Sequence, residues 1–526
     1  MKYTMYFAGL IACFFSIVAV QAQENKFLNS PARKLQLAEF AIANLYVDEV
    51  NEGKLVEEAI VKMLEQLDPH STYSDPEEVK KMNEPLQGNF EGIGIQFNMA
   101  EDTLLVIQPV SGGPSEKAGI LAGDRIVMVE DTLIAGVKMS TEDIMRRLRG
   151  PKDSKVNLKI LRRGVKELLP FTVKRDKIPV YSLDASYMIK DKIGYIRINR
   201  FAATTHEEFK KALAELQKKG MKDLILDLQG NGGGYLNAAI DIANEFLGKK
   251  ELIVYTEGRR NPRSEFFAKG TGEFQNGRLI VLVDEFSASA SEIVTGAVQD
   301  WDRGVVVGRR SFGKGLVQRP IDLPDGSMIR LTVARYYVPS GRSIQKPYDE
   351  GKEKYYTDIY QRLLHGEFSQ KDSIHFDEKL KYQTVGGRTV YGGGGIMPDL
   401  FVPGDTVGFS RYLVEVNRKN QYLYDFTFDF MDRHRQETKN IKDYKQLLKY
   451  LDRFDLVNEM ADYAAAKGLK RDEKGIRDSY DVLNSLIKAF IGRHVLDDDG
   501  FYPILYQNDV TIKKAIEAQG TGVQAD

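Results

Sequence analysis

Two stretches in the middle of the 526-residue chain are rich in apolar residues, and each leads through small residues into a segment with helical periodicity. Residues 223–228 precede a glycine-rich loop and a predicted helix at 236–247, and residues 278–284 precede a short turn and a predicted helix to about residue 300. A strand without polar alternation is typical of a sheet covered on both faces, and strands that alternate with helices favour parallel pairing. Residues 176 to about 348 therefore predict an α/β domain.

The rest of the chain divides into three further regions, as expected because one hydrophobic core rarely serves so long a chain. Helical periodicity predicts an N-terminal helical region at 23–87, and short alternating strands predict a small β-rich domain at 88–175. The α/β domain extends to 405, and a charged helical region follows at 406–526, with a strong amphipathic segment at 482–491. We expect a multidomain α/β and α+β protein.

The first 22 residues predict a secretory signal peptide. Lys2 is followed by an apolar run at 6–20 and by the small residue Ala22 ahead of Gln23. The run is shorter than the ~20 residues that a membrane-spanning helix needs. A lipobox-like sequence ends at Cys13 but lies inside the run, so we favour cleavage near Gln23 over a membrane anchor or a lipid.

Composition narrows the chemistry. Lys plus Arg (74) nearly equals Asp plus Glu (75), which gives no bulk electrostatic case for a nucleic-acid partner. Cys13 is the only cysteine, so the mature chain would have no disulfide, no thiolate metal site and no cysteine nucleophile. The six histidines lack the spacing of zinc hydrolases. We expect no metal and no cofactor, and any nucleophile must be an oxygen.

A serine stands where the turn after residues 278–284 meets the following helix. Ser289 is the middle one of three alternating serines, with Ser287 before it and Ser291 after it. The N–H groups and the partial positive charge of a helix N-terminus would stabilise an oxyanion beside Ser289. Serines at such positions also simply cap helices, and this segment alone leaves both interpretations open.

Four glycines stand in the loop at 229–234, directly after the strand at 223–228. In such a loop backbone amides can point at an anion, because no side chain blocks the approach. Neither the dinucleotide fingerprint nor the Walker spacing is present. The loop predicts an anion or oxyanion site without deciding which.

Lys314 lies between two glycines, and Gln318 follows four residues later on the same face of either a strand or a helix. Burial favours the neutral amine that a general base requires, and a neighbouring amide can hold that amine without adding charge. An exposed lysine in a hairpin is the alternative that the segment leaves open.

Together, Ser287–Glu292, Phe312–Gly315 and Gln318 resemble the catalytic signature of the carboxy-terminal processing peptidases, also called tail-specific proteases. The resemblance implies that Ser289 is the nucleophile, Lys314 its base and Gln318 the residue that orients the lysine. It also implies a crotonase-like β/α protease core with an oxyanion hole made by the backbone amides of Gly234 and Ala290.

Two further segments, 67–71 and 193–198, resemble family landmarks, which makes His70 a structural residue rather than a member of a catalytic triad. Gln229 is a departure, because family members usually carry Arg at this point of the glycine loop. That difference puts local packing or substrate contacts in doubt, but not the Ser289–Lys314 dyad.

Gly92, Ile93, Gly94 and Ile95 resemble the carboxylate-binding loop and the first strand residue of a PDZ domain. Such amides can capture a terminal carboxylate while the strand pairs with an extended peptide. Helix residues such as Ile144 and Leu148 would line the pocket for the apolar end of that peptide. A buried hairpin without a ligand is the alternative.

These observations favour an exported serine endopeptidase that recognises substrate C-terminal tails through a PDZ-like domain and cleaves with a Ser-Lys dyad. We expect it in the periplasm or cell envelope of a bacterium. Its substrates would be proteins or peptides with free C-termini, and an adaptor protein is a possible further partner. Its membrane contact would be the export signal alone. Two alternatives are a non-catalytic PDZ scaffold or chaperone, disfavoured by the intact catalytic set, and a crotonase-like acyl-CoA enzyme, disfavoured by the export signal.

Overall fold

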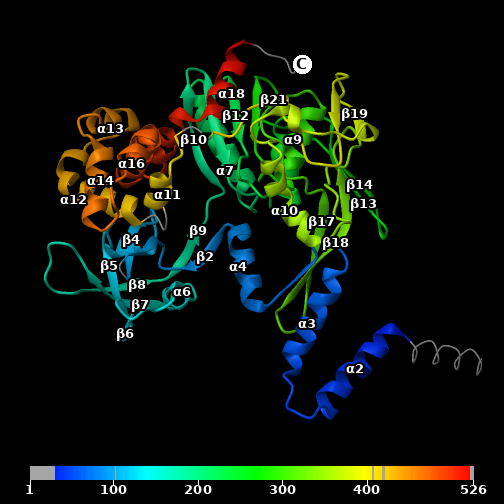
Figure 1. Cartoon of the computed structure of the whole chain (residues 1–526), viewed down its shortest axis with the longest axis horizontal. Helices are drawn as coiled ribbons and strands as arrows, with labels where there is room; N and C mark the ends of the chain where they lie inside the picture. The colour runs from blue at the N-terminus through cyan, green and yellow to red at the C-terminus, as the bar shows by residue number, and fades with distance from the viewer. Residues whose placement is uncertain (1–29, 101, 406–407, 418–420, 522–526) are drawn as a thin grey trace, which may run out of the picture. The chain divides into compact units, whose positions relative to one another are not determined.

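A computed structural model describes residues 30–100, 102–405, 408–417 and 421–521, which divide into two units (Figure 1). The predicted signal peptide lies outside the described residues. The first unit contains the described residues up to Pro76 together with 318–332, and the second contains 77–317 and the chain from Val333 onward.

The first unit is mainly helical. Its elements are α2 (Pro31–Leu45), α3 (Glu52–Glu65), β1 (Thr72–Ser74), most of β17 (Leu316–Asp322) and the first half of β18 (Met328–Tyr337). β1 pairs antiparallel with β18, with Thr72 opposite Arg330. Both helices start at a capping side chain, Ser30 for α2 and Asn51 for α3, which accepts a hydrogen bond from the third residue beyond it. The two helices expected from the periodicity are confirmed.

The second unit begins with α4 (Pro76–Gln87) and then a small β-rich module. Its elements are β2 (Asn89–Gly92), β3 (Ile95–Ala100), β4 (Thr103–Pro109), α5 (Pro114–Ala118), β5 (Arg125–Val129), β6 (Thr132–Leu133), α6 (Thr141–Leu148), β7 (Lys155–Leu161), β8 (Leu169–Lys174) and β9 (Asp176–Pro179). The sheet order is β3-β4-β5-β7-β8, so β3 is an edge strand. β2 and β9, where the chain enters and leaves the module, pair with each other.

A six-stranded sheet forms the centre of the α/β domain, in the order β10-β11-β12-β15-β16-β21. The strands are β10 (Leu183–Lys190), β11 (Ile193–Ile198), β12 (Asp223–Asp227), β15 (Leu279–Val283), β16 (Val305–Gly308) and β21 (Leu400–Phe401). All neighbours from β11 to β21 pair in parallel, and β10 is antiparallel to β11. The predicted parallel arrangement is confirmed.

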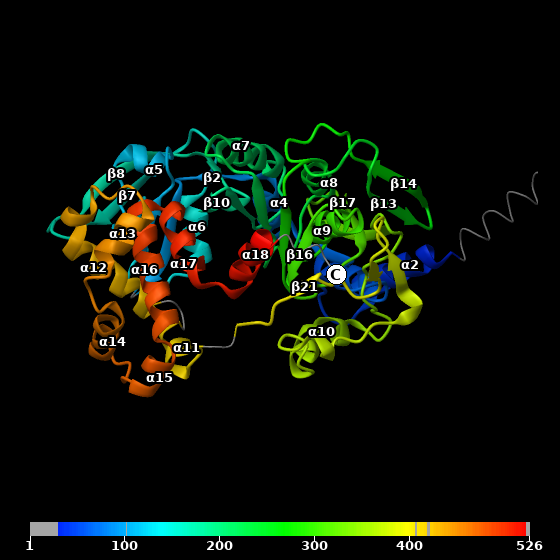
Figure 2. The same ribbon diagram turned by 90° about the horizontal axis from the view of Figure 1, so that it is seen from above.

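Both faces of this sheet are buried, as the apolar strands require. Side chains such as Leu224 and Leu226 face a core shared with α7 (Thr205–Lys218), α8 (Leu236–Asn244) and α9 (Ala290–Asp300). Ile225 and Ile280 face the opposite way, toward α18 (Val510–Thr521) at the end of the chain, whose label lies beside the sheet in Figure 2. The C-terminal helix is therefore part of the α/β core.

The α/β domain also carries β13 (Leu252–Gly258) and β14 (Asn261–Phe267), an antiparallel pair in which β13 joins the second half of β18 at Tyr337. Between β18 and β21 the chain forms α10 (Lys352–Leu364), two short 3₁₀ turns (Lys371–Ser373 and Glu378–Leu380) and the hairpin β19 (Lys381–Gln383) with β20 (Thr389–Tyr391).

The remaining helices form a C-terminal bundle with its own apolar core. They are α11 (Arg411–Asn417), α12 (Gln421–Thr438), α13 (Tyr444–Leu451), α14 (Leu456–Ala466), α15 (Glu473–Asp478), α16 (Tyr480–Leu496) and α17 (Asp498–Leu505), and a 3₁₀ turn (Tyr506–Asn508) leads on to α18. The amphipathic segment at 482–491 lies in α16, as predicted. Among the described helices none is long and apolar enough to cross a membrane.

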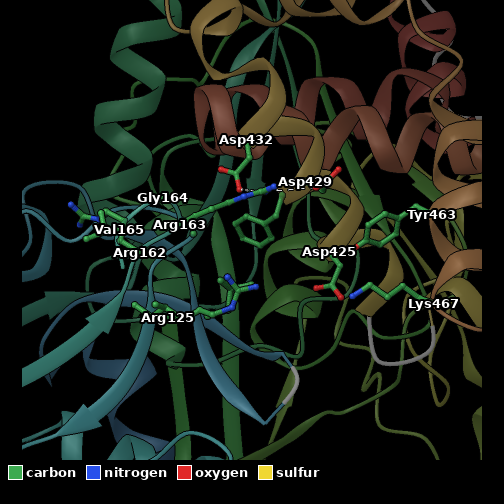
Figure 3. Close-up of a pocket in the computed structure, with 14 residues that line it drawn as sticks. Arg125, Arg162, Arg163, Gly164, Val165, Asp425, Asp429, Asp432, Tyr463 and Lys467 are labelled. Atoms are coloured by element: carbon green, nitrogen blue, oxygen red, sulfur yellow. Dashed lines mark hydrogen bonds and ion pairs between the residues drawn. The ribbon is translucent and has the colours of Figure 1, made fainter. Parts of the chain in front are cut away.

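The bundle contacts the β-rich module at a cleft with charges of both signs (Figure 3). From the loop between β7 and β8, Arg163 forms ion pairs with Asp432 (2.6 Å) and Asp429 (3.7 Å) of α12. These side chains are partly exposed, and such pairs contribute only about 0–1 kcal/mol each, weakened by salt.

Candidate active site

Ser289 has an unusual backbone conformation at the start of α9. Its φ of 58° and ψ of −112° lie outside the regions that a residue with a side chain ordinarily adopts, and such strain concentrates at functional sites. Ser287 and Ser291 are fully buried, and their Oγ atoms donate hydrogen bonds to the carbonyl oxygens of Leu228 and Asn231, each at 2.8 Å. Ser289 is the one member of this triplet that is partly exposed, whereas its two neighbours are structural.

The glycine loop packs directly against Ser289. A Cβ atom added to Gly233, whose φ is +104°, would lie 2.9 Å from the Cβ of Ser289 and 3.0 Å from the amide nitrogen of Ala290. Asn231 fixes the contact, because its carbonyl accepts a hydrogen bond from the Ala288 amide at 3.0 Å. A side chain at position 233 would therefore push the loop away from the serine.

The predicted oxyanion donors, the amides of Gly234 and Ala290, come from these two adjacent segments. The carbonyl of Gly233 accepts a hydrogen bond from the amide of Phe201 (2.9 Å). A trans peptide directs its C=O and N–H to opposite sides, so the Gly234 N–H points away from Phe201. Ala290 is the first residue of α9, and a first-turn N–H has no acceptor within its own helix.

Glu292, in the first turn of α9, connects Ser289, the predicted nucleophile, to the segment that carries the predicted base. Its Oε2 atom accepts hydrogen bonds from the amides of Ser289 (2.9 Å) and Lys314 (2.8 Å). Because both amides bond to one oxygen atom, the backbones of these two residues lie close together. Its Oε1 atom accepts from the Ser311 hydroxyl (2.5 Å) and the Gly313 amide (2.7 Å). Burial raises the pKa of Glu292, and the four donors act in the opposite direction.

Two more contacts fix the same segments. The buried hydroxyl of Tyr336 lies 2.7 Å from the carbonyl oxygen of Lys314 and 3.1 Å from that of Ser289. Asp284 joins the glycine loop to the turn before the serine, since its Oδ1 accepts from the amides of Gly230 (2.9 Å) and Ser287 (3.0 Å). Burial raises the pKa of Asp284.

Gln229, the departure from the family pattern, is held by its backbone. Its amide donates to Oδ1 of Asp227 at 2.8 Å, and its carbonyl accepts from Arg197 at 2.8 Å. Arg197 and Asp227 form an ion pair at 2.6 Å, and Asp227 is fully buried. The start of the loop is thus fixed without the side chain at position 229.

Gln318 belongs to the first unit, where its Nε2 lies 3.4 Å from Oγ1 of Thr332. Thr332 donates to Oδ1 of Asp68 at 3.0 Å, and the same oxygen accepts from the amide of His70 at 2.8 Å. His70 thus contributes a backbone hydrogen bond to this network, and its structural role stays a prediction. The orienting role of Gln318 stays a prediction.

In the β-rich module the loop Gly92–Ile95 directs two amides outward. The carbonyl of Ile93 accepts from the hydroxyl of Ser115 (2.7 Å), and the carbonyl of Gly94 accepts from the amide of Val110 (3.0 Å). The N–H groups of Gly94 and Ile95 belong to the same two peptides and therefore point away from the module's body. Ile144 and Leu148 are buried beside Ile93 in the module's core.

Among the residues described, no three His, Cys, Asp or Glu side chains stand together as a metal ion would require.

Comparison with known proteins places this site in a family. Residues 192–351 match the family model for peptidase family S41, 92–174 match the PDZ domain, 16–78 match the activating protease CtpB N-terminal domain, and 412–497 match a family of unknown function, DUF8443. The S41 match contains Ser289, Lys314 and Gln318.

Individual proteins with similar sequences support the same family assignment. The carboxy-terminal-processing protease of Bartonella bacilliformis is 38% identical over 336 residues, which are 62% of this chain and 76% of that protein. The carboxy-terminal processing protease CtpB of Bacillus subtilis is 36% identical over 332 residues, 62% of this chain and 68% of that protein. A solved photosystem II D1 C-terminal processing protease is 31% identical and covers 61% of this chain and 85% of its own, with a TM-score of 0.35. The chain belongs to the S41 family of carboxy-terminal processing serine proteases.

Proposed function

We propose that this protein is an exported endopeptidase that captures substrate C-terminal tails in its PDZ domain and cleaves with Ser289 and Lys314. The observation that supports the dyad best is the shared carboxylate of Glu292, which accepts hydrogen bonds from the amides of both residues. The strained backbone of Ser289 and the adjoining glycine loop support the same assignment.

In this proposal Ser289 Oγ attacks the scissile carbonyl carbon while Lys314 Nζ takes the hydroxyl proton. The Gly234 and Ala290 amides hold the oxyanion that develops, and Lys314 returns the proton to the leaving amine as the C–N bond breaks. Water, deprotonated by Lys314, then hydrolyses the acyl-enzyme. The dyad and both amides must therefore stand together when the scissile carbonyl is attacked.

Tail capture would use the amides of Gly94 and Ile95 together with the edge strand β3. Both N–H groups point outward, and β3 has a sheet neighbour on one side only, so an extended peptide can pair along its other edge. The terminal carboxylate of that peptide would accept hydrogen bonds from the loop amides. Ile95 and Phe97 alternate along the strand and are partly exposed, as contacts to an apolar tail require.

Amidation of a substrate tail tests this assignment. A C-terminal amide is neutral and carries donors, so the charge-assisted hydrogen bonds would be lost, at about 1.5–3 kcal/mol or roughly tenfold to a hundredfold in affinity. The free-acid peptide should therefore be cleaved at a correspondingly higher kcat/KM than its amidated form. A variant without residues 88–175, if it folds and cleaves, should lose this preference. Equal cleavage of both peptides by the intact protein would show that the PDZ domain does not read tails.

Export is supported by the apolar run at 6–20 and by Ala22 ahead of Gln23. We expect the native protein to begin near Gln23, to contain no cysteine and to be found in the periplasm or cell envelope. Intact-mass measurement of protein purified from its native cells decides this. A retained N-terminus, or a lipid on Cys13, would contradict it.

A further inference from the structure

A second lysine, Lys346, lies in the protein interior beside the base-bearing segment. It is 5% exposed, and its Nζ donates to the carbonyl of Tyr355 (3.1 Å) and to Oδ2 of Asp358 (2.9 Å). The same ammonium stands 4.0 Å from the ring centroid of Phe312 and 4.3 Å from that of Tyr355. A buried cation is tolerated when it is paired, and aromatic faces attract it most strongly when water is excluded.

The backbone around Lys346 flanks Lys314 on both sides. The amide of Lys346 donates to the carbonyl of Gly313 at 3.0 Å, and the amide of Gly315 donates to Oε1 of Gln345 at 2.8 Å. Together with Phe312 beside the ammonium, three neighbours of the base, at positions 312, 313 and 315, contact Gln345 or Lys346. Glu292 holds the amides of Gly313 and Lys314, so the segment is fixed by two independent sets of contacts.

The partners of Lys346 come from α10, which lies outside the S41 match. That match ends at residue 351, and α10 begins at Lys352. Arg362 at the end of α10 also donates to the carbonyls of Ser311 (3.1 Å) and Arg310 (2.7 Å), just before the base-bearing segment. The helix and the segment therefore share several polar contacts.

We propose that Lys346 is a positioning residue for Lys314: its ammonium clamps the Phe312 ring to α10 and so fixes the segment that presents the base. This inference rests on the proposed role of Lys314. It assigns α10 a part in catalysis that the S41 match does not contain, because the position of the helix is transmitted through Asp358 and Lys346 to the base.

The test compares Lys346→Met with Lys346→Arg in the full-length protein. Methionine resembles the lysine chain in length without a charge, whereas arginine keeps the cation but changes the shape. If the ammonium is what matters, Lys346→Met should lower kcat on a free-acid peptide by roughly 10- to 100-fold with little change in KM, as expected for a misplaced catalytic group. The rate at which a fluorophosphonate modifies Ser289 should fall in proportion. Lys346→Arg should keep more of both activities than Lys346→Met.

Arg303→Met is the matched control. Arg303 is a partly buried cation of the same α/β domain. It donates to the carbonyls of Phe246 (3.0 Å) and Phe274 (2.8 Å) and stands 5.8 Å from the Phe274 ring, so these contacts lie away from residues 311–315. The Arg303→Met variant should have a lower midpoint of thermal unfolding and a kcat near the wild-type value. Asp358→Asn should lower kcat less than Lys346→Met, and the double variant should be scarcely worse than Lys346→Met, because contacting residues are non-additive.

Three outcomes would overturn the inference: wild-type kcat in Lys346→Met, a more active methionine than arginine variant, or an equal loss in Arg303→Met. If Lys346→Met does not fold, Asp358→Asn decides in its place, and wild-type kcat in that variant is the contrary result. Lys314→Ala is measured in parallel. An active Lys314→Ala refutes the dyad, whereas an inactive Lys314→Ala beside a fully active Lys346→Met refutes the positioning role alone.

Discussion

Ser289→Ala and Lys314→Ala should each lower peptide cleavage by roughly four to six orders of magnitude, because the two side chains form one catalytic unit in the proposed mechanism. The double variant should be scarcely worse than either single one. Each variant should stay folded, since Ser289 and Lys314 are partly exposed and the contacts that fix their backbones use amides and carbonyls.

Initial cleavage rates, with circular dichroism on the same samples, measure both parts of this prediction. Ser264→Ala is a suitable control, because Ser264 is an exposed serine on β14 of the same domain. Substantial turnover by a folded Lys314→Ala would remove the lysine from the mechanism. Loss of activity in all three variants would point to the preparation rather than to the dyad.

Glu292→Gln should cause the next largest loss. All four contacts of the carboxylate come from donors, so an amide NH₂ at either oxygen position faces at least one N–H without an acceptor. Each buried donor left unsatisfied costs about 1–3 kcal/mol of stability. Because the same contacts place Ser289 relative to Lys314, we also expect kcat to fall by about 100-fold or more.

Thr295→Val is the matched control for Glu292→Gln. Thr295 is buried one turn further along α9, and its hydroxyl donates to the carbonyl of Ser291 at 2.7 Å. The valine variant should lose a little stability and keep its kcat. The decisive measurement is kcat at a temperature well below the unfolding midpoint of each variant. An equal kcat for Glu292→Gln and Thr295→Val would mean that the carboxylate serves the fold alone.

Local elements of the catalytic domain could be predicted from the sequence. The apolar stretches at 223–228 and 278–284 are β12 and β15, and Ser289 lies at a strand–turn–helix junction as expected. The length of an apolar run and the small residues at a turn are local features of the sequence. They were sufficient to predict these two strands and the start of the helix. The multidomain α/β and α+β fold class, with its PDZ domain and helical ends, is confirmed by the structure and the family matches.

Contacts between distant segments could not be predicted. Glu292 looked like an acidic residue in the first turn of a helix, and nothing near position 313 indicates that its carboxylate accepts from that loop. In the same way, the apolar side of α18 shows that the helix is buried, but not that it covers β15 and β16 of the central sheet. Nothing in the sequence indicates that Lys346 is buried, because an isolated lysine is more often exposed than buried.

The three serines at 287, 289 and 291 differ in the structure more than in the sequence. The sequence left helix capping and nucleophilic attack as alternatives for Ser289. The structure gives structural hydrogen bonds to Ser287 and Ser291 and places the strained, partly exposed backbone at Ser289. Ser289 is also the N-cap residue of α9 and shares a capping box with Glu292, so its role as nucleophile stays a prediction.

Covalent trapping of the nucleophile tests the central claim most directly. The intact protein is treated with a fluorophosphonate probe, and the modified residue is located by peptide mass spectrometry in the wild type, Ser289→Ala and Lys314→Ala. We predict modification of Ser289 in the wild type, none within residues 287–291 of Ser289→Ala, and a strongly slowed reaction in Lys314→Ala. Modification of Ser287 or Ser291 instead, or reaction of Ser289 at an undiminished rate without Lys314, would contradict the proposed dyad.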